Sequence, residues 1–199
     1  MRRIQNKSDL REWLRYEKGK YEIKNLFISR IKEYLGCERE IIFFFQRRLR
    51  ITEYYQNTGN KFMYYLSMIM LQRYQRKYAL NIQPNVCGKG LKIMHLGSIL
   101  TNSNVRMGED VSLHINTCFV AGGNNDNAPT IGNSVVVGVG AIVLGGATIA
   151  DGIAIGAGAV VNKSFAEKDI TIAGVPARKI SNNGRKAWEN RKNYTDHNC

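Results

Sequence analysis

The chain has 199 residues, of which 44% are hydrophobic, and a formal net charge of +13. This length is enough for one sizeable core with a small accessory region. The longest nearly uncharged apolar run of its first half, residues 62–71, is shorter than the ~18 residues that cross a bilayer. No charged-then-apolar leader with a cleavage site is apparent, so we expect a cytoplasmic protein.

Most of the excess positive charge lies in residues 1–90. Such an excess attracts nucleic acid, an anionic membrane or an anionic substrate. No zinc-finger spacing and no aromatic ribonucleoprotein motif accompanies it, which argues against nucleic acid as a partner. The cysteines form no CxxC pair and no zinc-ligand spacing, so we expect free thiols and no metal site at Cys37, Cys87, Cys118 and Cys199.

Residues 1–80 carry helical patterns, and we expect them to form an N-terminal α-helical region. A first helix is predicted to begin at Ser8 or Asp9, with Glu12 in the position of a capping box. Further helices are predicted at residues 21–35, from Glu38 onward, and at residues 60–80.

The last of these segments repeats apolar side chains at steps of three to four residues, at Met63, Leu66, Met70 and Tyr74. A stripe of this kind usually packs in a core or against another subunit. Alternatively, the aromatic side chains of this half could contact the inner face of a membrane together with the basic residues Arg47, Arg48 and Arg50. Peripheral membrane contact therefore remains an alternative.

After residue 80 the pattern changes, because glycines become frequent and short β-branched runs appear. Cutting the segment 131–161 into sixes shows an aliphatic residue at each first position: Ile131, Val137, Val143, Ile149, Ile155 and Val161. Small or aliphatic residues follow four positions after the first five: Val135, Ala141, Ala147, Ile153 and Ala159. A period of six is typical of a parallel β-helix built from hexapeptide repeats.

In such a helix each hexapeptide forms one strand and one turn, and three of them form a triangular coil of ~18 residues. The aliphatic side chains point inward and stack on their copies in the next coil. The same frame continues backward through Phe119, Leu113 and Met107 and, after a two-residue slip, through Ile99 and Ile93. The polar segment 122–130, GGNNDNAPT, is expected to form a protruding loop of the kind that often carries function.

These patterns predict an α+β fold in three parts. Residues 1–80 form the helical region, residues 81–180 form the β-helix domain, and residues 181–199 form a short C-terminal extension. The protruding loop belongs to the β-helix domain.

Four segments, GKGLKIMHLGSIL, NAPTIGNSVVVGVGAIVLGG, IGAGAVVNKS and IAGVPARKI, resemble the hexapeptide acyltransferases. They are most similar to the serine acetyltransferase-like branch found in capsule and exopolysaccharide gene clusters. The resemblance covers about residues 80–180 and is especially specific at GVPARKI, which ends the coil in that family. It implies a left-handed β-helix, a homotrimer, acetyl-CoA as the donor, and active sites between neighbouring subunits.

The resemblance places His95 where the family has its catalytic histidine. There it would act as the general base that deprotonates the acceptor hydroxyl. The repeat stacks Ile93 on Leu113, so His114 is expected on the same face of the next coil. His114 would bind the acceptor or help to hold the transition state, or else would be an ordinary outward-facing residue.

Three departures from the family pattern bear on the acceptor. The family motif DIHP is NIQP, with Asn81 in place of the aspartate that orients the histidine. The family motif DH is Met94 followed by His95, and the Arg-His of its loop is Asn127 followed by Ala128. Because the amino-acid clamp is largely missing, we predict as acceptor a sugar hydroxyl of a capsular polysaccharide, an exopolysaccharide or a precursor. The residues expected to bind it are Asn81, Asn124, Asn125, Asp126 and Asn127.

The pantetheine arm of CoA is expected to lie along the edge of the coils and to bond to backbone groups. By the resemblance, the positions that match are Gly140, Ala141, Ala157 and Ala159. Lys163, Arg178 and Lys179 would meet the phosphates, or would form a solvated basic end. We expect direct transfer in a ternary complex without a metal, because no cysteine or serine lies in a motif typical of an acyl-enzyme.

Three alternatives remain open. The first keeps the enzyme and changes the acceptor, either to serine, as in a serine O-acetyltransferase of cysteine biosynthesis, or to the nitrogen of an aminosugar. The second is a non-catalytic β-helix scaffold. The third is a carbonic anhydrase-like trimer with zinc, which needs three histidines around the metal. The chain has two histidines in the repeat region and a third, His197, in its tail.

Overall fold

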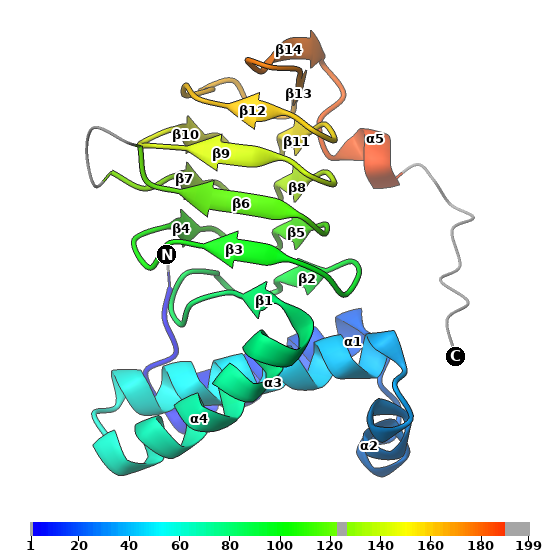
Figure 1. Cartoon of the computed structure of the whole chain (residues 1–199), viewed down its shortest axis with the longest axis vertical. Helices are drawn as coiled ribbons and strands as arrows, with labels where there is room; N and C mark the ends of the chain where they lie inside the picture. The colour runs from blue at the N-terminus through cyan, green and yellow to red at the C-terminus, as the bar shows by residue number, and fades with distance from the viewer. Residues whose placement is uncertain (1, 123–126, 190–199) are drawn as a thin grey trace.

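The computed structural model describes residues 2–122 and 127–189. Four helices form one end of the molecule, and the coils of a β-helix stack on them (Figure 1). The helices are α1 (Lys7–Lys20), α2 (Leu26–Tyr34), α3 (Glu38–Asn57) and α4 (Lys61–Tyr78). α3 packs against the other three and buries Phe45 and Leu49 completely, so it forms the centre of the helical region.

Asparagine side chains, and not the predicted Ser8 or Asp9, cap the first two helices. Oδ1 of Asn6 accepts a hydrogen bond from the backbone N–H of Asp9 at 2.9 Å and so starts α1. Asn25 caps α2 in the same way, which makes that helix begin later than the sequence pattern predicts. The predicted capping-box residue Glu12 instead forms ion pairs at the surface.

α4 buries a different face from the one that its apolar stripe predicts. Leu66 and Met70 of the stripe remain 42% and 38% exposed, whereas Leu71 and Gln75 are buried. The side-chain amide of Gln75 donates to the backbone oxygen of Ile82 at 3.0 Å and ties α4 to the start of the β-helix. Leu66 and Met70 therefore stay outside the core, whereas Tyr74, the last residue of the stripe, is partly buried and packs against it.

Arg50, which the sequence places with Arg47 and Arg48 on a basic surface, is fully buried. Its guanidinium pairs with Glu17 at 2.8 Å and with Glu53 at 2.9 Å. It also donates to two backbone oxygens of the first coil, those of Cys87 at 2.9 Å and Gly88 at 2.6 Å. Burial of a charge is tolerated when its hydrogen bonds are satisfied in this way. The contact joins α1 and α3 to the β-helix.

Three sheets enclose the core of the β-helix, and within them the coils stack as parallel strands. The five-stranded sheet contains β1 (Leu80–Asn81), β3 (Ile99–Thr101), β6 (Thr117–Val120), β9 (Ile142–Leu144) and β12 (Val160–Val161). The three-stranded sheet contains β4 (Arg106–Met107), β7 (Thr130–Ile131) and β10 (Thr148–Ile149). The six-stranded sheet contains β2 (Lys92–Ile93), β5 (Ser112–Leu113), β8 (Val136–Val137), β11 (Ala154–Ile155), β13 (Thr171–Ala173) and β14 (Arg178–Ser181).

The register confirms the predicted repeat. The inward aliphatic residues pair one coil apart, Ile131 with Ile149, Val137 with Ile155 and Val143 with Val161. Each of them is at most 2% exposed. The last coil is closed by β14, which runs antiparallel to β13 and begins in the GVPARKI segment. The polar segment ends at Pro129, because Thr130 already belongs to β7.

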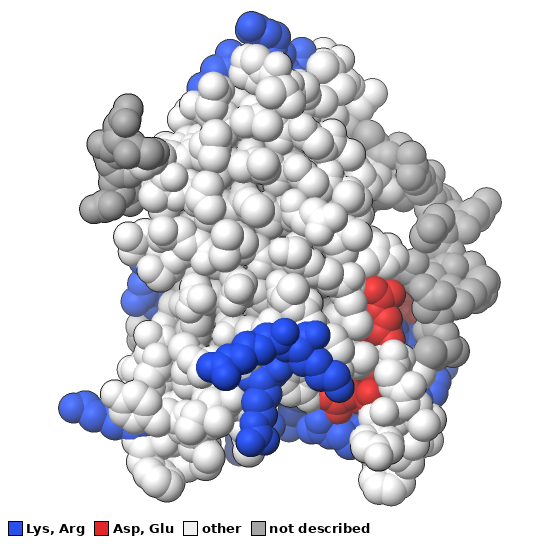
Figure 2. Space-filling model, in the orientation of Figure 1, with Lys and Arg blue, Asp and Glu red and all other residues white. Residues whose placement is uncertain are grey.

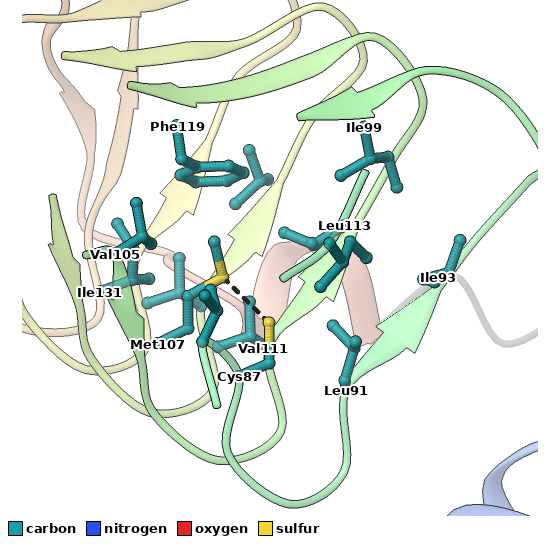
Figure 3. Close-up of a cluster of buried hydrophobic side chains, with 14 of the residues drawn as sticks. Cys87, Leu91, Ile93, Ile99, Val105, Met107, Val111, Leu113, Phe119 and Ile131 are labelled. Atoms are coloured by element: carbon teal, nitrogen blue, oxygen red, sulfur yellow. Dashed lines mark hydrogen bonds between the residues drawn. The ribbon is translucent and has the colours of Figure 1, made fainter. Parts of the chain in front are cut away.

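Figure 3 shows the core of the first coils, where side chains from all three sheets point toward one another. Sγ of Cys87 lies 3.6 Å from Sδ of Met107. Burial raises the pKa of the Cys87 thiol to about 12, so the group stays protonated and acts as a packing residue. Cys87 and Cys118 form no disulfide among the described residues.

Candidate active site

His95 lies in the turn between β2 and β3, and this turn is wider than the same turn one coil higher. The flanking strands are fixed by two register pairs, Ile93 with Leu113 and Ile99 with Thr117. Between these pairs the lower coil contains residues 94–98 and the next coil residues 114–116, so the predicted two-residue slip lies in this turn and not just before Met107. The widened turn leaves the side chain of His95 37% exposed.

Glu38, the first residue of α3, lies against this turn. Its Oε2 is 3.5 Å from Nδ1 of His95, and its Oε1 accepts a hydrogen bond from the backbone N–H of Leu96 at 2.5 Å. Because a carboxylate only accepts, the contact is a hydrogen bond in the tautomer that carries the imidazole proton on Nδ1, and in that tautomer Nε2 has a lone pair. The N-terminus of α3 favours the negative charge of Glu38. His95 therefore has the arrangement of an oriented base.

Tyr21 holds the strand that leads into the turn. Its hydroxyl accepts a hydrogen bond from the backbone N–H of Ile93 at 3.0 Å and donates to Oε1 of Gln46 at 3.0 Å. Burial raises the pKa of Tyr21 well above its ordinary value, so the hydroxyl keeps the proton that it donates. The helical region thus supports both the strand before His95 and the turn that carries it.

His114 lies one coil above the strand and turn of His95. Its Nδ1–H donates to the backbone oxygen of Val137 at 2.8 Å, and its ring packs against Trp188 of α5 (Lys186–Glu189) with centroids 5.1 Å apart. Burial lowers the pKa of His114, the bond to Val137 opposes this, and the charges of His95 and Lys92 lower it further. A neutral ring with a free Nε2 accepts hydrogen bonds, so His114 is not the donor that an oxyanion needs.

The turn of His95 begins a column of turns along one edge of the β-helix. Each turn donates to the one below it, Asn116 N–H to Ser98 O, Gly140 N–H to Ile115 O and Gly158 N–H to Val139 O. Gly140 and Gly158 have φ values of +71° and +66°, which glycine adopts without strain. Two of the predicted CoA-binding residues, Gly140 and Ala157, therefore lie on the same edge as His95.

The other two predicted alanines face inward. Ala141 and Ala159 are completely buried in the core. The backbone groups of both are already bonded: each N–H donates to the carbonyl of the glycine three residues earlier, and each carbonyl accepts from a neighbouring strand. The structure thus places these two residues in the core, because small side chains are needed at the inner corner of a coil.

The predicted phosphate-binding residues Lys163, Arg178 and Lys179 are exposed at the last coils. Figure 2 shows Lys and Arg side chains gathered at this end of the molecule. Nζ of Lys163 lies 5.5 Å from the ring centroid of Phe165, and Lys179 pairs with Glu167 at 2.5 Å. Lys163 follows β12, so it lies across the five-stranded sheet from the column of turns that begins at His95.

The structure describes two of the predicted acceptor-binding residues, Asn81 and Asn127. Asn124, Asn125 and Asp126 lie outside the described residues. Asn127 packs against Gly146, in the turn after β9. A Cβ atom added to Gly146 would lie only 3.2 Å from the Cβ atom of Asn127. This is the opposite edge of the five-stranded sheet. Asn81 lies on that sheet in register with Leu100, so it does not take the place beside Nδ1 that Glu38 occupies.

The outer face of the five-stranded sheet separates these two edges and is apolar. Four outward side chains follow one another in register, Leu100, Cys118, Ile142 and Val160. Figure 2 shows no Lys, Arg, Asp or Glu in the middle of this face. An open apolar sheet face of this kind favours association with another protein surface.

No family model matches the chain. A serine acetyltransferase of Buchnera aphidicola subsp. Acyrthosiphon pisum (strain APS) is 35% identical over 147 residues, covering 72% of this chain and 52% of that protein. A solved serine acetyltransferase in complex with CoA matches with a TM-score of 0.60 at 26% identity, over 70% of this chain and 57% of that chain. A serine acetyltransferase from Brucella abortus strain S19 matches with a TM-score of 0.69 at 21% identity, over 90% and 72%. The chain has the hexapeptide-repeat fold of the serine acetyltransferases.

The Brucella match covers most of the described helices as well as the repeats. It confirms the predicted fold class, a helical region followed by a left-handed β-helix. The chain spans about half the length of the Buchnera relative. The matches agree with the predicted acyltransferase class, and one of the matched serine acetyltransferase structures is a complex with CoA.

The prediction of a polysaccharide acceptor is wrong. The Buchnera relative and the two solved structures named above are serine acetyltransferases, and so is a mitochondrial relative from Arabidopsis thaliana. The prediction rested on missing clamp residues, and absent residues say little about what replaces them in space. Glu38 illustrates this, because a carboxylate lies beside His95 although Asn81 carries none.

Within residues 2–122 and 127–189, no helix is long and apolar enough to cross a membrane. Over the same residues, no group of three or more His, Cys, Asp or Glu side chains is placed to hold a metal ion.

Proposed function

We propose that the protein is an acetyl-CoA-dependent serine O-acetyltransferase. The observation that carries the proposal is the placement of His95, whose Nδ1 faces Glu38 in a widened turn at the foot of a column of glycine turns. This arrangement offers a base at Nε2 of His95 and, along the column of turns above His95, an open edge on which acetyl-CoA can bind. The similarity to serine acetyltransferases supports the choice of serine as the acceptor.

In the proposed reaction, Nε2 of His95 takes the proton of the serine hydroxyl while its oxygen attacks the thioester carbonyl of acetyl-CoA. A C–O bond forms, the C–S bond breaks, and the proton held by His95 passes to the leaving sulfur. Glu38 faces the imidazolium that forms in between. His114, with its lone pair at Nε2, is assigned to accept a hydrogen bond from the acceptor.

The proposed CoA path follows the column of turns. Gly140 and Ala157 line it with little side-chain bulk, so the pantetheine arm can approach the backbone. Lys163, Arg178 and Lys179 would meet the phosphates at the last coils, where all three are exposed. Within one chain Lys163 lies across the five-stranded sheet from the column, so it would serve a CoA bound along the edge of a neighbouring subunit.

We propose that the protein forms a homotrimer through the apolar face of the five-stranded sheet. The face is flanked by the edge of His95 on one side and by the edge of Asn127 on the other. Packing three copies around this face would bring the loop of one subunit toward His95 of the next. Asn124, Asn125, Asp126 and Asn127 would then contribute to an acceptor site shared between subunits.

The helical end is proposed to contact an anionic membrane surface. α4 contains no Asp or Glu, and it exposes the apolar side chains of Phe62, Tyr65 and Ile69. Its C-terminal half borders a pocket of about 650 Å³ that α2 shares and that Arg73 and Lys77 line. Cations beside exposed aromatic side chains match the chemistry of an anionic lipid surface. The three proposed units remain residues 1–80, 81–180 and 181–199.

The first experiment is a free-thiol assay of acetyl-CoA with the purified protein, using l-serine and a panel of sugars as acceptors. Turnover is expected with serine. The turnover rate should fall by at least ~100-fold in His95→Asn, which is the size of effect that removal of a general base produces. CoA binding and the melting temperature of the variant should match the parent, because His95 is partly exposed in a turn. Unchanged turnover in His95→Asn would remove His95 from the mechanism, and absence of turnover with serine would reject the proposed acceptor.

A further inference from the structure

The residue beside a catalytic imidazole decides which of its nitrogens is free to act. In the enzymes that this chain resembles, the aspartate of the DIHP motif has that place, and the chain has Asn81 instead. The structure keeps Asn81 on the five-stranded sheet, where its backbone oxygen accepts from Oγ1 of Thr101 at 3.3 Å. The group that faces Nδ1 of His95 is the carboxylate of Glu38.

We propose that Glu38, a residue of the helical region, is the positioning residue of His95. The inference rests on the proposed function, in which His95 is the base. Glu38 would hold the proton on Nδ1, fix the plane of the ring and stabilise the imidazolium that forms during transfer. The helical region would then complete the active site rather than only cap the β-helix.

The geometry around Glu38 fixes its carboxylate. One oxygen is held by the backbone N–H of Leu96, the residue that follows His95, so the carboxylate and the ring are tied to the same turn. The neighbouring Arg39 pairs with Glu40 at 2.7 Å and does not compete for Glu38. Among the described residues, His95 is the one basic side chain within ion-pair distance of Glu38. The Glu38 side chain is 28% exposed, so few water molecules can compete with His95 for its carboxylate.

Glu38→Gln separates the charge from the hydrogen bond. The amide oxygen of glutamine can still accept from Leu96 N–H, so the turn should keep its shape. The amide nitrogen would then donate to Nδ1, which moves the imidazole proton to Nε2 and blocks the base. We expect a fall in kcat of at least ~100-fold, with KM values for serine and acetyl-CoA within ~3-fold of the parent.

Two variants control the measurement. Glu38→Asp keeps the charge and should recover part of the activity that Glu38→Gln loses. Glu12→Gln removes a surface carboxylate that pairs with Arg2 and Lys89, and it should leave kcat unchanged. The melting temperature of each variant is recorded, because a loss of kcat accompanied by unfolding would count against a positioning role.

The tautomer of His95 is read separately by ¹⁵N NMR of histidine-labelled protein, with the signal assigned by its loss in His95→Asn. The chain has three histidines, so few signals overlap. A proton on Nδ1 in the parent and on Nε2 in Glu38→Gln supports the proposal. Parent-like signals in Glu38→Gln overturn it, whatever the kinetics. If the parent does not acetylate serine, the proposed function fails and this comparison alone decides the role of Glu38.

Discussion

At the scale of single residues, the partner of Nδ1 distinguishes the two histidines of the β-helix. Nδ1 of His95 lies 3.5 Å from the carboxylate of Glu38, which can only accept a hydrogen bond. Nδ1 of His114 faces a backbone carbonyl and its ring packs under Trp188, so the surroundings of this ring favour the neutral form. The first histidine is thus suited to proton transfer and the second to accepting a hydrogen bond.

The lowered pKa of His114 makes a prediction about stability. Below pH 6.5, the ordinary value, the unfolded chain binds a proton at His114 while the folded chain does not, so stability rises with pH between the lowered pKa and 6.5. The slope of melting temperature against pH across this window should therefore be smaller in His114→Gln, where glutamine keeps a donor for Val137 and does not titrate. Equal slopes in the two proteins would contradict burial of a neutral His114.

At the scale of elements, the sequence predicted what is local and missed what depends on packing. The β-helix follows from a six-residue period that any stretch of the repeat shows. The face that α4 buries does not follow from its stripe, because Leu71 and Gln75 are buried and Gln75 bonds to the start of the β-helix. The two extra residues of the repeat lie between Ile93 and Ile99, and the sequence pattern placed them between Ile99 and Met107. The pattern does not distinguish the two turns, because Ile99 points inward in either case.

The register itself is tested by a buried charge. Val143 pairs with Phe119 below and Val161 above and is completely buried, so Val143→Asp should cost more than about 3 kcal/mol of stability. The free energy of unfolding is measured with urea. Thr148→Asp, at an exposed position of β10, should cost less than about 1 kcal/mol.

Val143→Ala serves as a milder variant if Val143→Asp does not fold. It should cost roughly 1 to 3 kcal/mol by opening a small cavity. A Val143→Asp protein as stable as the Thr148→Asp protein would mean that the assumed inward register is wrong.

At the scale of the whole molecule, the site residues fall on two edges of one face. The repeat pattern could not predict this division, because the distance between edges is set by the width of the five-stranded sheet. Glu38 was missed for a related reason: it lies 57 positions before His95, and only packing of α3 under the first coil brings the two together. Asn81, where the resemblance leads one to expect an aspartate, was the one signal in the sequence that another group could lie beside His95.

The proposed trimer is tested at Ile142, the neighbour of Val143 on the opposite face of β9. Ile142→Asp places a charge in the apolar row between Cys118 and Val160 and should dissociate the assembly while the chain stays folded. The mass in solution is measured by sedimentation equilibrium, with Thr148→Asp as the control. A parent protein that is monomeric, or an Ile142→Asp protein that remains trimeric, would reject this face as the interface.

The membrane contact is tested with vesicles. The parent should sediment with phosphatidylserine vesicles, and the Arg73→Glu, Lys77→Glu double variant should not, because both cations line the pocket shared by α2 and α4. Phosphatidylcholine vesicles provide the uncharged control. Equal binding to both kinds of vesicle, or equal binding by parent and variant, would count against an anionic surface as the partner.

Buried Arg50 gives α3 a mechanical role. The residue is pinned between Glu17, Glu53 and the carbonyl oxygens of the first coil, twelve positions or about 18 Å along the helix from Glu38. The position of α3 is therefore fixed at Arg50, and its N-terminal residue Glu38 contacts the turn of His95. If α3 turned about its axis by the angle of one residue, Glu38 would move about 100° around the helix and away from the imidazole. Loss of Arg50 is therefore expected to disturb the position of Glu38 beside His95 as well as to weaken the contact between α3 and the first coil.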